Sequence, residues 1–196
     1  MQVRAEAVTS PVDDDARDAG ATRASRRRVW PLLVLLAVVT FAADQASKVW
    51  ALDALVPGAP RDLVGSVLRL NLIFNSGAAF SLGAGTTWLL TVVAVVIGVL
   101  VAWHARRIVS VPWAVAGGLV MGGLLGNLYD RLFRPPSFGQ GHVVDFLDYS
   151  GFFIGNVADI AIVCAAILVA LLSFVGISYD GTRAPDHAPS EEDTHA

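Results

Sequence analysis

Four long apolar segments limit what this chain can fold into. They cover residues 29–50, 86–103, 111–128 and 152–177. Each reaches the roughly 18–20 residues that a helix needs to cross about 30 Å of hydrocarbon. Because the bilayer core offers no water to exposed backbone groups, apolar runs of this length are expected to be helical. The sequence therefore predicts an all-α membrane protein with four transmembrane helices.

Composition agrees with several membrane spans. Of 196 residues, 55% are hydrophobic, and the mean hydropathy is +0.59, which is too apolar for an ordinary soluble domain. The net charge of −3 gives no reason to expect a nucleic-acid partner. The single cysteine, Cys164, rules out an intrachain disulfide and a cysteine-based metal cluster.

The membrane domain is predicted to span residues 29–177, between two disordered tails, 1–28 and 178–196. Both tails lack apolar periodicity. The first apolar segment could also be a cleaved signal peptide, since arginines precede it and small residues follow Phe41. A membrane helix is favoured because the helical pattern continues through Asp44 and Lys48, which lie four residues apart on one face.

Basic residues predict the orientation of the spans. Four arginines within residues 23–28 precede the first span, and Arg106 and Arg107 lie between the second and third. The positive-inside rule then places both termini in the cytoplasm. The long segment 51–85 lies outside, and the alternation of apolar and polar residues at 68–72 predicts a strand there. We expect a small extracytoplasmic β-strand-bearing element.

Polar side chains gather at the outer ends of the predicted helices. Ionisable residues at membrane depth normally face a bundle interior and mark a functional site. One-sided clustering indicates a site that is reached from outside the cell. The residues of this cluster are Asp44, Asn75, Asn127, Asp130, Arg131, Asp145, Asn156 and Asp159.

The acids of this region are not equivalent. Asp44 could form a simple ion pair with Lys48 or face a substrate. Asp130 shares a face with the glycines at 118, 122 and 126, which predicts a tight helix contact and a structural role. Asp148 resembles a solvated loop acid. Asp159 is expected about two turns into the fourth helix, where a carboxylate without a partner would be expensive.

Carboxylates are the chemistry that fits this cluster. It contains no Ser–His pair, no second histidine or cysteine for zinc and no phosphate-binding glycine loop. Two acids in a poorly solvated pocket share a proton, so one can activate water while the other binds a carbonyl. A proton-coupled transporter could use the same acids, but it is expected to place them near the midplane. A non-catalytic scaffold would need no paired acids.

Five ordered motifs carry a resemblance to a known family. The chain resembles the lipoprotein signal peptidases (signal peptidase II), which are bacterial inner-membrane aspartic peptidases. The likeness covers about residues 29–177. Its motifs are DQASK at 44–48, NSGAAF at 75–80, GGLLGNLYDR at 122–131, VVDF at 143–146 and NVAD at 156–159.

The resemblance implies an activity and a role for each residue. The family cleaves prolipoproteins before a cysteine that carries a diacylglyceryl group, uses no metal or organic cofactor and is inhibited by globomycin. By motif, Asp145 and Asp159 would form the catalytic dyad. The pocket or the dyad would be shaped by Asn75, Asn127, Arg131 and Asn156, with Asp44, Lys48 and Asp130 as supporting residues. One departure is Gly155, where the family usually has phenylalanine.

Overall fold

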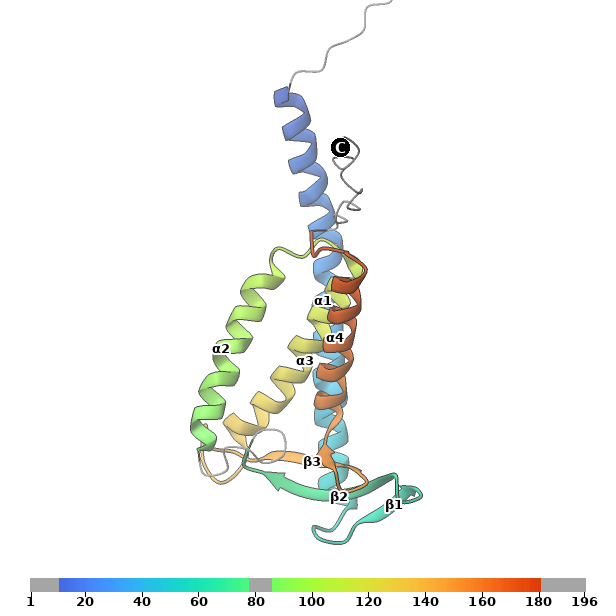
Figure 1. The fold of residues 1–196 in the computed structure, drawn as a ribbon. Helices are drawn as coiled ribbons and strands as arrows, with labels where there is room; N and C mark the ends of the chain where they lie inside the picture. Colours follow the sequence, from blue (N-terminus) through green and yellow to red (C-terminus); the bar gives the residue numbers. More distant parts are fainter. Residues whose placement is uncertain (1–10, 78–85, 181–196) are drawn as a thin grey trace, which may run out of the picture.

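The architecture is a bundle of four helices with a small sheet at one end (Figure 1). The computed structural model describes residues 11–77 and 86–180, with side chains from Val29 onward. The helices are α1 (Pro11–Ala54), α2 (Thr87–Ala105), α3 (Val111–Phe133) and α4 (Val157–Phe174). Within the described residues, four helical stretches are long and apolar enough to span a membrane, as predicted.

The sheet is antiparallel and follows the chain order β1-β2-β3-β4. Its strands are β1 (Arg61–Val64), β2 (Leu68–Asn75), β3 (Val143–Tyr149) and β4 (Phe153–Gly155). The predicted strand at 68–72 is confirmed as part of β2. A cluster of buried apolar side chains packs the sheet against the end of α1. Its members are Ala51, Leu55, Leu72, Val144 and Phe146. We call this end of the bundle the sheet end.

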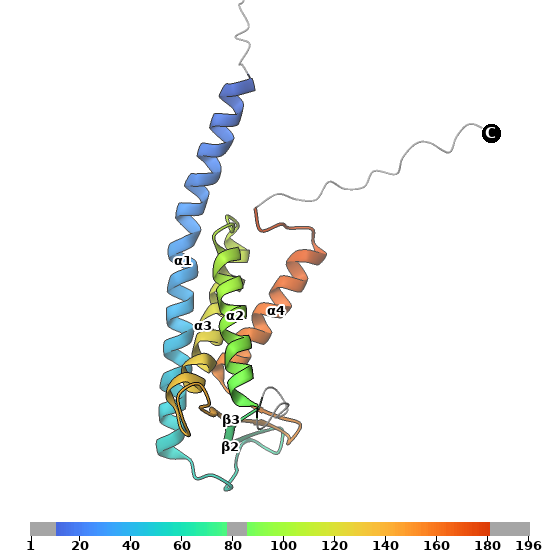
Figure 2. The ribbon, with the colours of Figure 1, turned by 90° about the vertical axis from the view of Figure 1, so that its left-hand side faces the viewer.

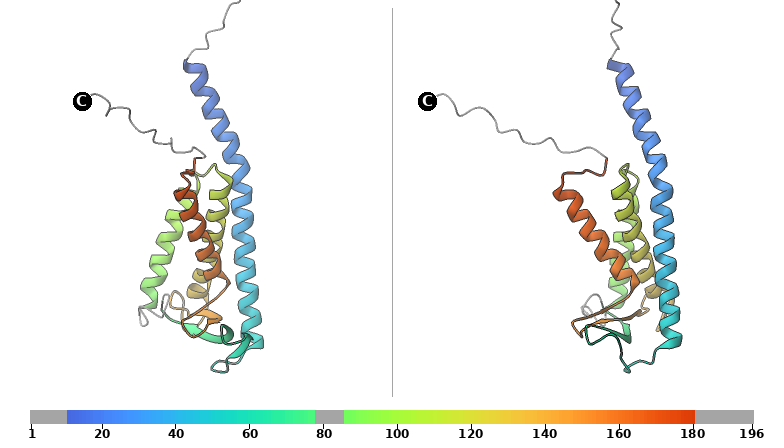
Figure 3. Two further views of the ribbon diagram at one scale, coloured as in Figure 1. Left: turned by 45° about the vertical axis from the view of Figure 1, so that its right-hand side comes forward. Right: turned by 90° about the vertical axis from the view of Figure 1, so that its right-hand side faces the viewer.

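Helix α3 is the centre of the bundle. It packs against α1 and α4, whereas α2 packs mainly against α3 (Figures 2 and 3). The glycine face of α3 meets α1 at backbone distance: a Cβ at Gly118 would lie 2.8 Å from the carbonyl oxygen of Leu33, and one at Gly122 would lie 2.6 Å from that of Ala37. The tight contact predicted from the glycine spacing is confirmed.

The prediction of a disordered tail over residues 1–28 is wrong for residues 11–28. Helix α1 begins at Pro11 and continues without a break past Ala43, so it extends beyond the other helices (Figure 2). Two physical effects explain this. The segment 11–28 is rich in alanine and arginine, which have high helix propensity, and extending an existing helix requires no nucleation step. Residues 1–10 and 181–196 lie outside the described part of the chain, so for them the tails remain predictions.

The predicted start of the fourth helix at residue 152 is also wrong. Residues Phe153–Gly155 form β4, and α4 begins only at Val157. A tight turn at Ser150 and Gly151, which have φ of 57° and 76°, folds β4 back onto β3. A short apolar run is compatible with either a strand or a helix. Here the pairing with β3 makes residues 153–155 a strand. Asp159 therefore lies in the first turn of α4 and not two turns into it.

The α1–α3 contact gives a first prediction. Gly122→Ala should lower the stability of the protein by about 1–3 kcal/mol, because the added methyl would collide with the α1 backbone, which cannot move aside easily. Thermal unfolding in detergent measures this. Gly98→Ala is the matched control, since its Cβ would meet only the flexible end of Leu124, at 2.8 Å. Equal stability of the two variants would contradict the close packing of α1 on α3.

Candidate active site

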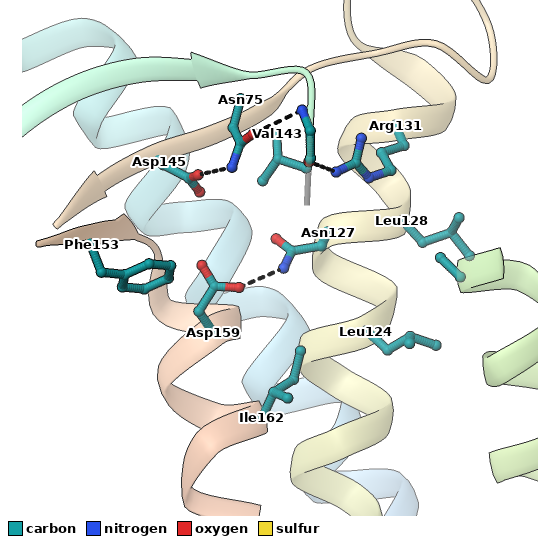
Figure 4. Close-up of a pocket in the computed structure, with 12 residues that line it drawn as sticks. Asn75, Leu124, Asn127, Leu128, Arg131, Val143, Asp145, Phe153, Asp159 and Ile162 are labelled. Atoms are coloured by element: carbon teal, nitrogen blue, oxygen red, sulfur yellow. Dashed lines mark hydrogen bonds between the residues drawn. The ribbon is translucent and has the colours of Figure 1, made fainter. Parts of the chain in front are cut away.

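Asp145 and Asp159 point into one cavity at the sheet end (Figure 4). The cavity has a volume of about 180 Å³ and lies between α2, α3, α4 and the sheet. Asp145 lies on β3, because residues 143–149 pair with β2. Three further residues of the predicted cluster line the same cavity: Asn75, Asn127 and Arg131.

The position of Asp159 is set by the start of α4. Asn156 is the N-cap, and its side-chain oxygen accepts the backbone N–H of Asp159 at 3.1 Å. Asp159 Oδ2 in turn accepts the N–H of Asn156 at 3.0 Å, which completes a capping box. Its Oδ1 accepts a hydrogen bond from Asn127 Nδ2 at 2.9 Å. The first helical turn favours a negative charge, so this environment suits an ionised carboxylate.

Asp145 is buried and accepts two side-chain amides. Asn75 Nδ2 donates to its Oδ2 at 2.9 Å, and Asn156 Nδ2 donates to its Oδ1 at 2.6 Å. Burial raises the pKa of Asp145 from 3.8 to about 7, and the neighbouring charge of Asp159 adds to the rise. The two amide donors and Lys48 oppose it by stabilising the anion. Asp145 is therefore a carboxyl group that can hold a proton near neutral pH.

Behind the two acids lies a fully buried ionic triad. Lys48 Nζ lies 2.8 Å from a carboxylate oxygen of Asp44 and 2.8 Å from one of Asp130. It also donates to Asn127 Oδ1 at 3.0 Å, so Asn127 connects the triad to Asp159. Arg134 binds the other oxygen of Asp130 at 2.6 Å. The ion-pair interpretation of Asp44 and the structural interpretation of Asp130 both fit this geometry.

The triad also fixes the backbone beside each acid. Asp44 Oδ1 accepts the N–H of Ala158, the residue before Asp159, at 2.9 Å. Asp130 Oδ2 accepts the N–H of Val144, the residue before Asp145, at 3.1 Å. A single lysine thus holds two carboxylates that anchor α4 and β3. These two backbone contacts help to fix where Asp145 and Asp159 lie relative to each other.

Arg131 is buried at the edge of the cavity. Its Nη2 donates to the carbonyl oxygen of Gly77, at the end of the described outer segment. Its Nη1 is buried and has no hydrogen-bond partner among the residues that the structure describes. An unpaired buried guanidinium nitrogen is costly unless a ligand completes it.

Asp148 is not the solvated loop acid that the sequence predicted. It is buried and lies 2.8 Å from Arg69 Nη2, and it also accepts the N–H of Gly151 at 2.6 Å. Pairing of β3 with β2 and β4 buries it. Its partners are structural, which separates it from the two acids of the cavity.

Two residues of the site were not among the predicted site residues, although one of them, Gln45, belongs to the DQASK motif. Gln45 donates from Nε2 both to Asp44 and to the carbonyl oxygen of Gly126, which ties the triad to α3. Phe153 lines the cavity, and its ring lies 2.6 Å from the place where a Cβ on Gly155 would be. Gly155, where the family usually has phenylalanine, thus leaves room for the ring of Phe153.

Metal binding has no obvious position in the described chain. Within residues 11–77 and 86–180, no group of three or more His, Cys, Asp or Glu side chains is arranged to hold an ion.

Comparison with known proteins agrees with the motifs. The sequence profile of the signal peptidase (SPase) II family matches residues 36–175, which include every residue of the site described above. The chain belongs to the signal peptidase II family. It is therefore a multi-pass membrane peptidase, and the transporter and scaffold alternatives are not supported.

Individual relatives cover most of the chain. A lipoprotein signal peptidase of Rhodococcus jostii (strain RHA1) is 44% identical over 171 residues, which are 87% of this chain and 86% of that protein. One of Mycolicibacterium smegmatis is 45% identical over 186 residues, 92% of this chain and 78% of that protein. A solved bacterial membrane enzyme, 24% identical, has the same fold with a TM-score of 0.66 over 74% of this chain and 88% of that one.

The triad gives a second prediction. Lys48→Met should destabilise this signal peptidase by about 3–5 kcal/mol, because it leaves two carboxylates buried without a counter-charge. Thermal unfolding in detergent is the measurement. The triple variant Asp44→Asn/Lys48→Met/Asp130→Asn is the control, since it buries no charge and should recover part of the lost stability. A Lys48→Met protein as stable as the parent would show that the triad does not organise the site.

Proposed function

We propose that this enzyme removes the signal peptide from prolipoproteins by cleaving before the diacylglyceryl-modified cysteine, with Asp145 and Asp159 as the catalytic dyad. The main support is the pair of carboxylates that point into one cavity, Asp145 buried and Asp159 partly buried, each with two hydrogen-bond donors. Two acids in such surroundings do not ionise together easily and titrate as a pair.

The environments of the two acids suggest different roles. Asp159 accepts a backbone N–H in the first turn of α4 and is the ionised member, which takes a proton from the attacking water. Asp145, with its pKa near 7, is the protonated member and donates a hydrogen bond to the scissile carbonyl. When the tetrahedral intermediate collapses, the leaving amine receives the proton that Asp159 took from water.

Arg131 and the asparagines have supporting roles in this proposal. Arg131 Nη1, which has no partner within residues 11–77 and 86–180, can donate to a backbone carbonyl of the bound peptide. Asn75 and Asn156 orient Asp145, and Asn127 orients Asp159. Asp44, Lys48 and Asp130 hold the backbone beside the dyad and do not touch the substrate.

A second hollow beside the dyad fits a lipid-bearing substrate. It has a volume of about 530 Å³, and Asp159 and Phe153 line both it and the first cavity. Its other walls are largely apolar and come from the β3–β4 hairpin and the exposed side of α4: Tyr149, Phe152, Ile160, Val163 and Cys164. Acyl chains on the modified cysteine could remain in the bilayer here while the peptide enters the polar cavity.

The proposed orientation puts the dyad at the extracytoplasmic leaflet and both termini in the cytoplasm. The arginines before α1 and those between α2 and α3 support it. Five basic residues at the sheet end count against this orientation: Lys48, Arg61, Arg69, Arg131 and Arg134. Lys48, Arg69 and Arg134 are in ion pairs, and Arg131 donates to the carbonyl oxygen of Gly77, so four of the five have structural partners.

The third prediction tests the dyad. Asp145→Asn and Asp159→Asn should each lower cleavage of a diacylglyceryl-modified prolipoprotein by about 10²–10⁴-fold or more, since one removes the acid at the scissile carbonyl and the other removes the base that activates water. A gel shift of the substrate, with and without globomycin, measures cleavage. Asp62→Asn, on the exposed strand β1, is the matched control. Full activity of purified Asp159→Asn protein would refute the assignment.

Stability distinguishes a lost dyad from a misfolded variant. Folding raises the pKa of Asp145 above its unfolded value, so its contribution to stability falls as the pH rises from about 4 to about 7. An asparagine at position 145 does not ionise, so Asp145→Asn avoids this loss of stability at high pH. The inactive variant should therefore be at least as stable as the parent at pH 8.

The fourth prediction concerns the pH profile. Turnover should fall as the pH rises through about 7, because Asp145 then loses its proton. Asn75→Ala removes a donor that stabilises the anion, which raises the pKa of Asp145 and moves this fall to higher pH. Asn71→Ala is the control, since Asn71 lies on the same strand but donates to Asp148. A fall at unchanged pH in Asn75→Ala would argue against Asp145 as the protonated acid.

A further inference from the structure

A third hollow lies at the end of the bundle opposite the sheet. It is a groove of about 360 Å³ between α2, α3 and α4. Most of its wall is apolar and includes Leu100, Val101, Ile108, Val120 and Val169. Three ring side chains that carry polar atoms also line the groove: His104, Trp113 and Tyr179. The groove shares no lining residue with the cavity of the dyad.

The segment that follows α4 gives this groove a defined end. The carbonyl oxygen of Tyr179 accepts the N–H groups of Val109 and Ser110 at 3.0 and 3.3 Å, and Trp113 Nε1 donates to the carbonyl oxygen of Ile177 at 2.8 Å. The Tyr179 ring meets His104 edge to face, with centroids 5.6 Å apart. These contacts join the α2–α3 loop to the chain after α4, so the mouth of the groove has a fixed shape.

Positive charge lies beside this mouth. Arg106 and Arg107 are exposed and belong to the same loop that Tyr179 binds. Neither forms an ion pair within the described residues, and Arg107 lies over the Trp103 ring at 4.5 Å. One acid, Asp180, follows Tyr179 in the chain. Two arginines against this single acid leave a net positive charge at the mouth of the groove. An apolar slot below exposed guanidinium groups matches the two parts of an anionic lipid.

We propose that this groove is a binding site for an anionic phospholipid, with one acyl chain between α2, α3 and α4 and the phosphate at Arg106 and Arg107. Basic pockets between membrane helices are suited to anionic head groups, and guanidinium groups bind phosphate through paired N–H donors. Tryptophan and tyrosine are the side chains expected where an acyl chain meets a head group. A zwitterionic lipid offers the same chain without the net charge.

Thermal unfolding of the full chain in detergent tests this site with defined lipids. Added dioleoylphosphatidylglycerol should raise the unfolding midpoint by about 3 °C or more, whereas dioleoylphosphatidylcholine and free glycerol phosphate should raise it much less. Native mass spectrometry should show one tightly retained phosphatidylglycerol.

Variants assign the effect to the groove. Arg106→Gln/Arg107→Gln should lose the phosphatidylglycerol shift, and Arg106→Lys/Arg107→Lys should keep part of it. Val120→Phe fills the groove and should also lose the shift. Arg61→Gln, on the exposed strand β1, is the control for a lost surface charge and should respond like the parent. Cleavage in detergent should stay unchanged in the Arg106 and Arg107 variants, because the dyad lies at the other end.

Three outcomes would overturn the proposal. Equal shifts with both lipids would mean general solvation of the helices by lipid. An equal shift with glycerol phosphate would mean an anion contact without a chain in the groove. A full phosphatidylglycerol shift in the Arg106→Gln/Arg107→Gln protein would separate the arginines from the binding. None of these results depends on whether the enzyme cleaves prolipoproteins.

Discussion

Lys48 is fully buried between two carboxylates, and the geometry of the site depends on that contact. A buried charge is tolerated only when it is paired and hydrogen-bonded, and here each acid of the pair has a second function. Asp44 binds the backbone next to Asp159, and Asp130 binds the backbone next to Asp145. Moving any of the three would move α4 or β3, so stability and positioning are linked.

The same network explains how two further acids can remain in a poorly solvated place. Each carboxylate of the proposed dyad accepts two hydrogen bonds, mostly from asparagine amides, which stabilise without adding charge. Asn156 joins both acids, since it caps α4 beside Asp159 and donates to Asp145. Neutral donors leave the acids able to exchange a proton, whereas a nearby arginine contact would keep both ionised.

Much of this could be predicted from the sequence, for physical reasons. Apolar runs of sufficient length leave the backbone no alternative to helix in a bilayer, so the four spans were predictable. Glycines at steps of four on α3 predicted the close approach to α1. The cost of a carboxylate beside apolar residues singled out Asp159, and ordered motifs singled out Asp145. Where the sequence failed, at 11–28, at the start of α4 and at Asp148, the local pattern allowed two structures.

The membrane class of the protein, the number of its spans and the residue types available for chemistry follow from hydrophobicity and side-chain identity, which are properties of the chain before it folds. Contacts between distant segments place Asp145 on a strand and Asp159 in a capping box. They also join Asp44 to Asp130 through Lys48 and assign Asp148 to a separate structural pair. Pairing of β3 with β2 and β4 joins segments far apart in the chain. No local pattern encodes which of several acids such pairing brings together.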